Sequence, residues 1–381
     1  MIICEPIASG VEHVPINTQL LANVIKGNEC SIKLFCEATH WERLKETLSA
    51  GELSRVSYYE SPSWKAKRRK IDWFRQFQFL RSINKLSEKN EEWLFLGVNR
   101  PIYLWLCLFF RVRKKTIIFH SILADIDGWQ SRNPFLRLVS LKVMLESFAK
   151  HSPEIVVLEE YIKRELISII PALKNRVLVI PHPLPADQFR NFKKHEDVNV
   201  YDIGFPGIFS YDKGADLYRK ICMAGDFRSI NYHVIGRNAT NNEVAVLRRY
   251  LKSGPYDASL SREIYVQNVN KCDYLFFSQN ESHYKLTASG VFLDAIYFEK
   301  PIIARKTPNL EALTNGLWNI GYFYESEEQL KSILHEIDSH SPGLRDDYAM
   351  FIEALCKLKK DRELEFRRSV NLYLCSSEAA S

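Results

Sequence analysis

The sequence predicts an α/β protein made of two halves of similar size, each a parallel sheet with helices on both faces. Short apolar runs alternate with amphipathic segments along most of the chain, a pattern typical of parallel strands joined by covering helices. One polar, charged stretch, PADQFRNFKKHEDVN at residues 185–199, interrupts the alternation near the middle and indicates a linker. With 381 residues, the chain is long enough for two domains of ordinary size.

In the first half, six apolar runs predict buried strands: Ile2–Cys4, Ile32–Phe35, Trp93–Gly97, Thr116–Phe119, Ile155–Leu158 and Val177–Ile180. Five amphipathic segments between them predict helices: Asn17–Ile25, Trp41–Leu48, Ile71–Leu86, Pro134–Phe148 and Tyr161–Ile169. Because a helix separates most successive strands, we expect crossover connections and a parallel sheet.

The second half repeats the alternation. Its predicted strands are Ile203–Phe205, Tyr232–Ile235, Ile264–Val266, Tyr274–Phe277 and Pro301–Ala304. Its predicted helices are Lys213–Cys222, Asn242–Lys252, Gly290–Tyr297 and Glu327–Ile337, followed by a final helical stretch from about Asp346 to Leu374.

These segments predict four regions along the chain. They are a first domain over residues 1–185, a linker over 186–200, a second domain over 201–345, and a C-terminal helix over 346–381 that packs back toward the first domain. Ligands of such sheets bind at the carboxyl ends of the strands, so we expect a ligand cleft between the two halves.

Composition excludes several classes of protein. The net charge of +6 is modest, and no nucleic-acid signature accompanies it, so we expect no nucleic-acid partner; the charge suits phosphorylated substrates or an anionic membrane surface. The eight cysteines show no metal-ligand spacing and the N-terminus no signal-peptide layout, which predicts a cytoplasmic protein. The longest apolar run, Ile102–Phe110, is far short of the roughly 20 residues of a membrane-spanning helix.

The most informative segment is YKLTASGVFLDAIYFEKPII, residues 284–303. Small residues precede a helix, and the N–H groups of a helix N-terminus form a natural anion site. Ser289 adds a hydroxyl and Gly290 allows close approach of a ligand. Asp294, about one turn further along, could bind a sugar hydroxyl, a combination that suits a sugar nucleotide. The alternative is a capped helix followed by a buried strand.

Two further glycine loops follow predicted strands. GIFSYDKG, residues 207–214, would place the cation of Lys213 beside a phosphate held near Gly207; the alternative is an ordinary turn with a surface lysine. The loop Ala8–His13 follows the first strand, where Gly10 would let a phosphate or substrate approach and His13 could act as an acid or base. A surface histidine in a loop is the alternative there.

His120 ends the predicted strand Thr116–Phe119. A polar side chain at the carboxyl end of a buried strand faces the expected ligand edge, so His120 is a candidate site residue, with a structural role as the alternative. His182 also ends a strand, but the prolines on either side of it make the chain rigid where it leaves the strand and favour a structural role.

A basic, aromatic segment covers residues 64–81, WKAKRRKIDWFRQFQFLR. Its aromatic residues repeat at helical spacing and form one face. Basic residues beside such a face suit the surface of an anionic membrane, and the basic residues of 111–115 could add to it. The alternative is a core-facing helix with a solvated basic flank.

With these pieces in order, the chain resembles a glycosyltransferase of the GT-B superfamily, whose members have two Rossmann-like domains. It is most similar to the retaining, nucleotide-sugar-dependent enzymes that build bacterial surface polysaccharides. The resemblance covers both halves and rests on four segments: Ile180 to Pro183, Phe205 to Gly214, His233 to Gly236, and Ser289 to Pro301.

The resemblance implies roles for individual residues. Gly207, Lys213 and the N–H groups near Ser289 and Gly290 would hold the donor diphosphate, and Asp294 would bind the nucleotide ribose. His120 would sit beside the transferred sugar and Gly10 would face the donor phosphates. The resemblance also implies retaining transfer. Because Lys213 and a helix N-terminus can stabilise the leaving diphosphate, we expect no requirement for a metal ion or other cofactor.

Two positions depart from the family pattern. An arginine often follows the first glycine of the Gly…Lys-Gly motif, where this chain has Ile208. The family's paired-glutamate motif has an acid eight residues before the ribose-binding acid, where this chain has Leu286. Glu281 could replace that acid only if its loop folds back.

The sequence therefore predicts a cytoplasmic, membrane-peripheral glycosyltransferase that moves a hexose or related sugar from a nucleotide-sugar donor to a saccharide acceptor, with a lipid-linked acceptor expected. Two alternatives stay open. One is a nucleotide-sugar epimerase or hydrolase on the same fold, and the other is a non-catalytic binding subunit, to which Ile208 and Leu286 point.

Overall fold

The structure is a computed structural model that describes residues 1–10, 13–28, 30–62, 69–110, 114–120, 122–126, 140–150, 153–185, 200–240, 244–279, 285–314 and 316–375. The chain forms two compact units. The first unit contains Met1–Ala186, Lys285–Ala288 and Arg362–Ser381, and the second contains Asp187–Tyr284 and Ser289–Asp361. The predicted linker, apart from residue 200, lies outside the described residues. The cleft expected between the halves stays a prediction.

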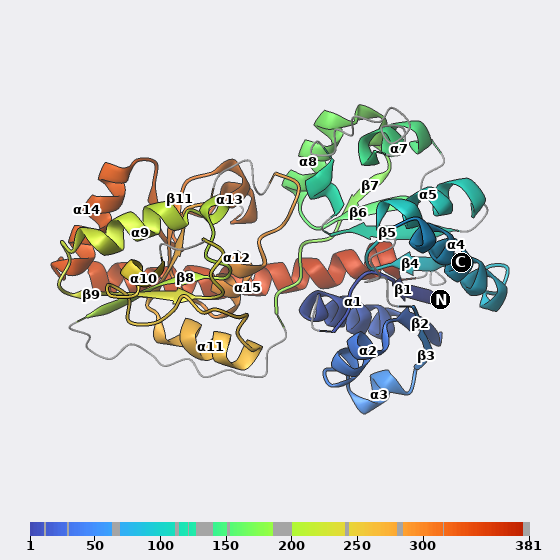
Figure 1. Cartoon of the computed structure of the whole chain (residues 1–381), viewed down its shortest axis with the longest axis horizontal. Coiled ribbons are helices and arrows are strands. Elements are labelled where there is room, and N and C mark those ends of the chain that lie inside the picture. The colour runs from blue at the N-terminus through green and yellow to red at the C-terminus, as the bar shows by residue number, and fades with distance from the viewer. Residues whose placement is uncertain are drawn as a thin grey trace. The chain divides into compact units, whose positions relative to one another are not determined.

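The first unit contains a seven-stranded parallel sheet with the order β3-β2-β1-β4-β5-β6-β7 (Figure 1). Its strands are β1 (Ile2–Glu5), β2 (Ile32–Cys36), β3 (Val56–Glu60), β4 (Trp93–Phe95), β5 (Lys115–Phe119), β6 (Glu154–Val157) and β7 (Val177–Val179). The strand order reverses between β1 and β4, which is where ligands bind in open α/β sheets.

Helices join these strands. They are α1 (Val14–Gly27), α2 (Ala38–Lys45), α3 (Ala50–Leu53), α4 (Arg69–Leu86), α5 (Arg100–Phe109), α7 (Leu141–Phe148) and α8 (Glu160–Ile169), with short 3-10 turns η1 (Ile122–Asp125) and η2 (Pro171–Leu173). Right-handed crossovers place α1 to α3 on one face of the sheet and the later helices on the other.

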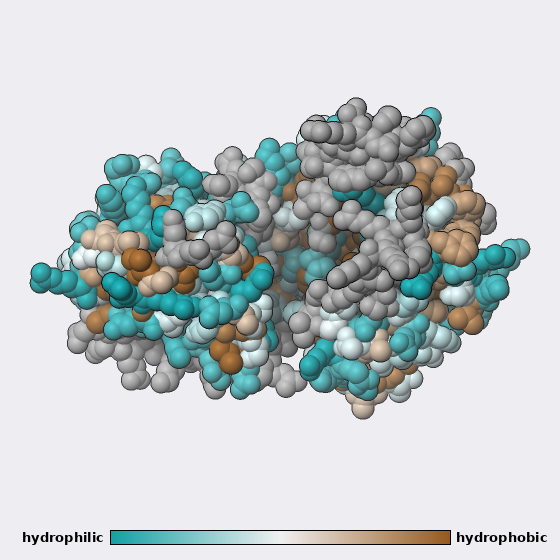
Figure 2. Space-filling model, in the orientation of Figure 1, coloured by the Kyte–Doolittle hydropathy of each residue, from teal (hydrophilic) through white to brown (hydrophobic). Residues whose placement is uncertain are grey.

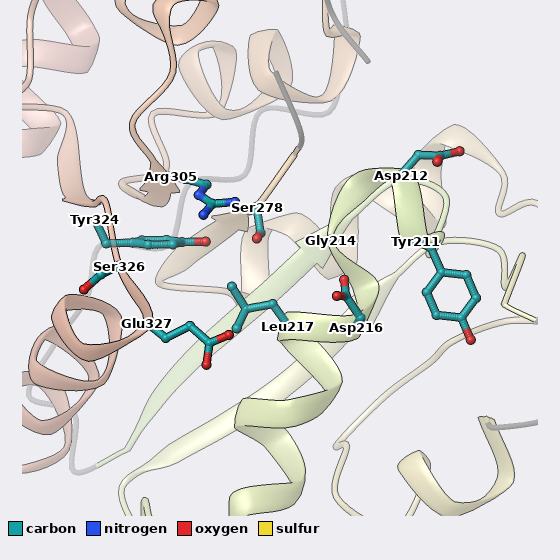
Figure 3. A pocket seen from close by; sticks show the side chains of 10 residues that line it. All are labelled: Tyr211, Asp212, Gly214, Asp216, Leu217, Ser278, Arg305, Tyr324, Ser326 and Glu327. Carbon is teal, nitrogen blue, oxygen red and sulfur yellow. The ribbon is translucent and has the colours of Figure 1, made fainter. Parts of the chain in front are cut away.

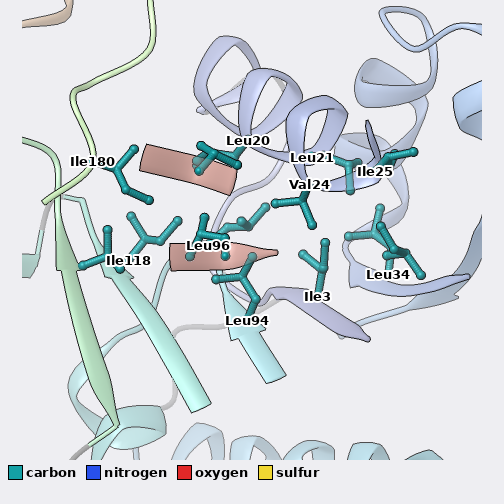
Figure 4. Packing of buried hydrophobic residues seen from close by; sticks show 14 of the residues in the cluster. Ile3, Leu20, Leu21, Val24, Ile25, Leu34, Leu94, Leu96, Ile118 and Ile180 are labelled. Carbon is teal, nitrogen blue, oxygen red and sulfur yellow. The ribbon is translucent and has the colours of Figure 1, made fainter. Parts of the chain in front are cut away.

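The core under α1 shows why the strand runs are apolar. The helix contributes Leu20, Leu21 and Val24 to a buried cluster with strand residues such as Ile3 and Leu94 (Figure 4). The last turns of the C-terminal helix α15 (Leu344–Leu374) join the same cluster through Phe366, Val370 and Leu374. Residues of α15 up to Asp361 belong to the second unit and those from Arg362 to the first.

The second unit contains a five-stranded parallel sheet with the order β12-β11-β10-β8-β9 (Figure 1). Its strands are β8 (Tyr201–Pro206), β9 (Ile230–Ile235), β10 (Tyr274–Phe277), β11 (Ile302–Arg305) and β12 (Gly321–Tyr324). Its other elements are η3 (Tyr211–Lys213), α9 (Ala215–Ala224), α10 (Val244–Leu247), α11 (Arg262–Lys271), α12 (Gly290–Tyr297), α13 (Pro308–Leu313) and α14 (Glu327–Asp338). Here the strand order reverses between β8 and β10.

The predicted α/β class with parallel sheets is confirmed, but one predicted strand is wrong. Ile264–Val266 lies in the helix α11. Ser261 caps that helix by accepting a hydrogen bond from the backbone N–H of Ile264, and Tyr265, Val266 and Val269 are buried, which is helical spacing.

Other differences concern short elements. The strands β3 and β12 have no counterpart among the predicted strands. Most of Ile102–Phe110 forms α5, a helix that was not predicted. The helix predicted at Asn242–Lys252 is confined to Val244–Leu247, with residues 242 and 243 outside the described part. The segment predicted from Pro134 is described only from residue 140. Among the described helices, none combines the length and apolar character needed to cross a membrane.

Candidate functional site

The predicted phosphate-binding residues of the second unit meet at one place. Gly207 follows β8 in the left-handed region, with φ of +83°. A Cβ atom added there would lie 2.8 Å from Cγ1 of Val291, in the first turn of α12, and 3.5 Å from Nζ of Lys213. The lysine cation and the N-terminus of α12 therefore both face Gly207, although they lie far apart in the sequence.

The backbone conformation at Gly214 helps to direct Lys213 toward Gly207. The predicted helix from Lys213 begins at Ala215, because Gly214 adopts φ of +83° and separates the 3-10 turn of Lys213 from α9. A Cβ on Gly214 would also collide with the backbone of Ser278. Glycine is thus required at the position that ends the turn.

Lys213 is mostly buried, and burial lowers the pKa of its ammonium group. Among the described residues, no acid forms an ion pair with it. A half-buried cation without a counter-charge is costly, and a bound anion would remove that cost. Lys213 therefore has the environment of a ligand-binding cation.

The N-terminus of α12 also has hydrogen-bonding groups that lack partners among the described residues. Ser289 precedes the helix, is 4% exposed, and its hydroxyl has no hydrogen-bond partner among the described groups. Gly290 is exposed, and a Cβ there would meet no described atom within 4 Å. In the described part of the chain, open space thus lies beside a helix terminus whose first N–H groups have no side-chain cap.

Asp294 has a partner that the sequence did not indicate. Its carboxylate is 5% exposed and forms a bidentate ion pair with Arg262 of α11, over distances of 2.6 Å and 3.2 Å. The same guanidinium lies over the rings of Tyr265 and Phe298. The role of Asp294 in ribose binding stays a prediction, and a ribose bound there would share the carboxylate with Arg262.

In the first unit, Gly10 is held from two sides. Its N–H donates to Oγ1 of Thr39 at 3.0 Å, and its carbonyl lies 3.0 Å from Nδ1 of His40. Gly10 itself has φ of +56°, a conformation that favours glycine. The loop after β1 is therefore rigidly placed at the carboxyl edge of the sheet.

A buried carboxylate anchors the start of that loop. Glu5, at the end of β1, is fully buried and accepts hydrogen bonds from the N–H groups of Ile7 and Ala8 and from the amide of Asn17. The same Asn17 amide lies 3.1 Å from Nε2 of His40. This network links the loop after β1 to α1 and α2, and it was not predicted from the sequence.

Three histidines gather at the same edge. The ring of His120 lies 4.3 Å from that of His13 and 5.8 Å from that of His182. Burial, and then the two neighbouring imidazoles, lower the pKa of His120 to about 2; burial lowers the pKa of His182 to about 4. Nδ1 of His120 has no partner among the described groups. His120 is therefore a neutral imidazole with a free polar atom at working pH.

An ion pair supports His182. Glu159 precedes α8, and its carboxylate accepts hydrogen bonds from Arg362 of α15 and from the backbone N–H of His182. All three residues are buried. Burial raises the pKa of Glu159 despite the opposing effect of Arg362. Only the tertiary structure brings Arg362 here, so no local sequence pattern could have indicated it.

The two departures from the family pattern have physical consequences. Leu286 is 8% exposed and belongs to the first unit, where neighbouring Thr287 accepts a hydrogen bond from Tyr161 of α8. A buried apolar anchor thus stands where an acid was expected. Ile208 is 39% exposed beside Gly207, so no cation follows that glycine. Glu281 lies outside the described residues.

The described site residues can bind an anion and position a polar ligand. Lys213 and α12 form an anion site in the second unit, while His120 presents a neutral donor or acceptor in the first. Within the described residues, no cluster of histidine, cysteine and carboxylate side chains could hold a metal ion. The metal-independent mechanism stays a prediction.

Neither a known family model nor a curated protein sequence matches this chain. Its structure is similar to that of a glycosyltransferase from Rickettsia africae ESF-5, at 16% identity and a TM-score of 0.66, over 98% of this chain and 97% of the other. It is also similar to HepE of Anabaena in complex with UDP-glucose, at 11% identity and a TM-score of 0.59, over 97% of both chains.

A third similar structure is WaaG, a glycosyltransferase involved in lipopolysaccharide biosynthesis, at 10% identity and a TM-score of 0.59, over 97% of this chain and 98% of the other. Because every identity is low, these similarities establish the fold and leave the activity open. They confirm the predicted GT-B fold with two Rossmann-like domains.

Proposed function

We propose that this chain is a glycosyltransferase that moves a sugar from a nucleotide-sugar donor to a saccharide acceptor. One observation carries the proposal: Lys213 and the first turn of α12 face the same point over Gly207. A diphosphate placed there would meet a cation that has no acid partner within the described residues, together with uncapped helix N–H groups. The names of the structural neighbours, one of them bound to UDP-glucose, support the same activity.

The chemistry follows from these groups. The bond between the sugar carbon and the diphosphate oxygen breaks, and a bond from that carbon to an acceptor hydroxyl oxygen forms. Negative charge grows on the diphosphate, where Lys213 and α12 would stabilise it. In a retaining, same-face reaction the acceptor proton passes to the leaving phosphate. His120, being neutral, would position the sugar by hydrogen bonding and would not act as an acid.

A non-catalytic binding subunit is the second candidate. Leu286 supplies no acid for the donor sugar, and Asp294 already pairs with Arg262. In that case the anion site over Gly207 would bind a nucleotide without turnover. The two candidates differ in whether a bound donor is consumed.

A ligand screen tests the donor site. UDP, GDP, CMP and their common sugar conjugates are added to the purified protein without metal, and the thermal midpoint is measured. We expect one diphosphate to raise the midpoint, because it binds the folded state alone. Transfer to an added acceptor then separates the two candidates. A screen in which no nucleotide shifts the midpoint would argue against both.

The proposed acceptor is lipid-linked, and the first unit offers an apolar surface that suits a membrane. Phe74 of α4 and Leu108 and Phe109 of α5 are exposed. Figure 2 shows hydrophobic residues gathered over this part of the first unit. We call these three residues the apolar surface. Deeper in the same helix pair, Phe77 packs against Trp105 with ring centroids 5.1 Å apart.

Of the basic residues at 111–115, the two whose side chains are described are engaged within the protein. Lys115 is buried in β5, bonds the carbonyl of Phe110, and burial lowers its pKa to about 8. Lys114 pairs with Glu92. The basic residues at 64–68, 111 and 113, and the side chains of 69 and 70, lie outside the described part. Within the described residues, the proposal of membrane contact therefore rests on the apolar surface.

Replacing Phe74 and Phe109 with serine should weaken binding to phosphatidylglycerol vesicles by about tenfold or more, because each apolar side chain transferred from water contributes about 1.5–3 kcal/mol. Vesicle co-sedimentation measures the effect. The matched control replaces Leu364 and Leu372, which are exposed on α15, and should bind as wild type does. Equal losses in both variants would contradict a specific membrane surface.

A further inference from the structure

The second unit contains a cavity of about 350 Å³ that the proposed transfer does not use. It lies at the carboxyl edge of the five-stranded sheet, where β10, β11 and β12 end. Its lining combines residues after these strands with the first turns of α9 and α14: Tyr211, Asp212, Gly214, Asp216, Leu217, Ser278, Arg305, Tyr324, Ser326 and Glu327. The volume falls within the range of small-molecule sites, about 300–1,000 Å³.

Hydrogen-bond donors gather on one wall. Figure 3 shows Arg305, Ser278 and the hydroxyl of Tyr324 turned toward one another. Tyr324 is 1% exposed, and its hydroxyl makes no hydrogen bond of normal geometry to a described group. Burial raises the pKa of Tyr324, while Ser278 and Arg305 act in the opposite direction. Arg305 forms no ion pair with an acid in the described part of the chain. The Tyr324 hydroxyl and the Arg305 guanidinium on this wall thus have hydrogen-bonding capacity that a ligand could use.

Acceptors occupy the other wall. Asp216 in the first turn of α9 and Glu327 at the start of α14 bring carboxylates to the cavity (Figure 3). The partial positive charge of each helix N-terminus stabilises these acids. Glu327 also pairs with Lys220, which lies outside this lining. A ligand in the cavity would therefore meet donors on one side and acceptors on the other.

This distribution selects the chemistry of the ligand. A phosphate or sulfate ion is negatively charged and would be repelled by Asp216 and Glu327. An amine only donates and would be repelled by Arg305. A hydroxyl group both donates and accepts, so a ligand with several hydroxyl groups can satisfy both walls at once. A sugar ring has this chemistry and fits the size of the cavity.

The predicted donor residues do not line the cavity, although Asp212 and Gly214, on either side of Lys213, do. Gly207, Lys213, Ser289, Gly290 and Asp294 are all absent from its lining. The strand order reverses at β8, so the crossovers through α9 and α12 run in opposite directions. Right-handed crossovers then place the two helices on opposite faces of the sheet. Residues of α9 and α14 share one core cluster, so the cavity between them lies on the face away from α12.

We propose that this cavity binds a small saccharide at a site separate from the nucleotide-sugar donor. Arg305, Ser278 and Tyr324 donate hydrogen bonds to its hydroxyl oxygens, and Asp216 and Glu327 accept hydrogen bonds from its hydroxyl groups. The proposal does not depend on transfer activity, since it concerns binding alone.

Saturation-transfer NMR of the full chain with glucose, galactose, mannose or N-acetylglucosamine at millimolar concentration tests the proposal. We expect saturable binding of at least one sugar. Arg305→Gln and Asp216→Asn should each weaken it by about tenfold, because each removes a hydrogen bond to a charged group. Glu325→Gln, which changes an exposed neighbouring acid outside the lining, should leave binding unchanged.

Two further measurements distinguish the proposed saccharide site from the donor site and from a site for simple ions. Binding should persist in Lys213→Ala and in the presence of saturating UDP, even if the donor proposal itself fails. Inorganic phosphate and ethylamine should not compete with the sugar. The proposal is overturned if no sugar binds saturably, or if both Arg305→Gln and Asp216→Asn bind the sugar as wild type does. It is also overturned if UDP displaces the sugar, or if the cavity binds phosphate and Asp216→Asn strengthens that binding.

Discussion

Lys213→Ala is expected to lower the rate of sugar transfer by about 10²–10³-fold, the usual effect of losing one charge-stabilising group at a leaving anion. Lys213 is the cation that faces the first turn of α12 over Gly207. The variant should also lose the midpoint shift produced by the donor nucleotide. Steady-state transfer with the ligand identified in the screen, together with thermal melting, measures both effects.

The thermal stability of Lys213→Ala should not fall, in contrast to its transfer rate. Lys213 is half-buried without an acid partner among the described residues, and burial lowers its pKa. Removing this charge should therefore relieve a desolvation cost in the ligand-free protein. We expect the midpoint of the ligand-free variant to equal or exceed that of wild type. Lys331→Ala, an exposed lysine on α14, should change neither transfer nor stability. Retained transfer in Lys213→Ala would contradict the donor site.

The pKa direction adds a pH dependence to the same experiment. The lowered pKa means that Lys213 loses its proton at a lower pH than an ordinary lysine does, whereas a bound diphosphate favours the charged form. Donor affinity should therefore be constant at low pH and fall as pH rises through the pKa of the free protein, by up to tenfold per pH unit. Lys213→Arg stays charged and should lose this dependence.

The fold was largely readable from the sequence because buried parallel strands are nearly continuous apolar runs. Strands such as β5 and β10 are buried along their whole length, and their sequences show it. The edge strands β3 and β12 are half-buried and rich in tyrosine, so they gave no such run. Ile264–Val266 was wrongly predicted as a strand because it is such an apolar run. A short β-branched and aromatic run also suits the buried face of a helix.

The sequence could indicate only those parts of the candidate site whose residues are close together along the chain. The Gly207 to Gly214 loop and the start of α12 carry their chemistry in adjacent residues, so each could be singled out from the sequence. They lie close together in the structure, and their role in donor binding stays a prediction. Arg262 and Asp294 lie 32 residues apart, and Glu159 and Arg362 lie 203 residues apart. Pairings of this kind depend on packing between distant elements, and periodicity holds no information about them.

The ion pair of Glu159 and Arg362 should dominate the stability of the first unit. Arg362→Met keeps most of the side-chain volume but leaves the buried Glu159 carboxylate without its counter-charge, which typically costs about 3–5 kcal/mol. We expect the thermal midpoint of the full chain to fall by several degrees. Lys359→Met removes a neighbouring ion pair with Glu299 in the second unit, and serves as the comparison for a less buried pair.

The double variant Glu159→Gln with Arg362→Met decides what that pair contributes. Burial already raises the pKa of Glu159, so the carboxylate is costly even when paired, and a neutral glutamine should recover much of the stability that Arg362→Met loses. Lowering the pH is a poorer test, because acid would also protonate His120 and His182 on unfolding, which destabilises the native state below about pH 6.5. A double variant no more stable than Arg362→Met would show that packing of α15, and not the buried charge, sets the loss.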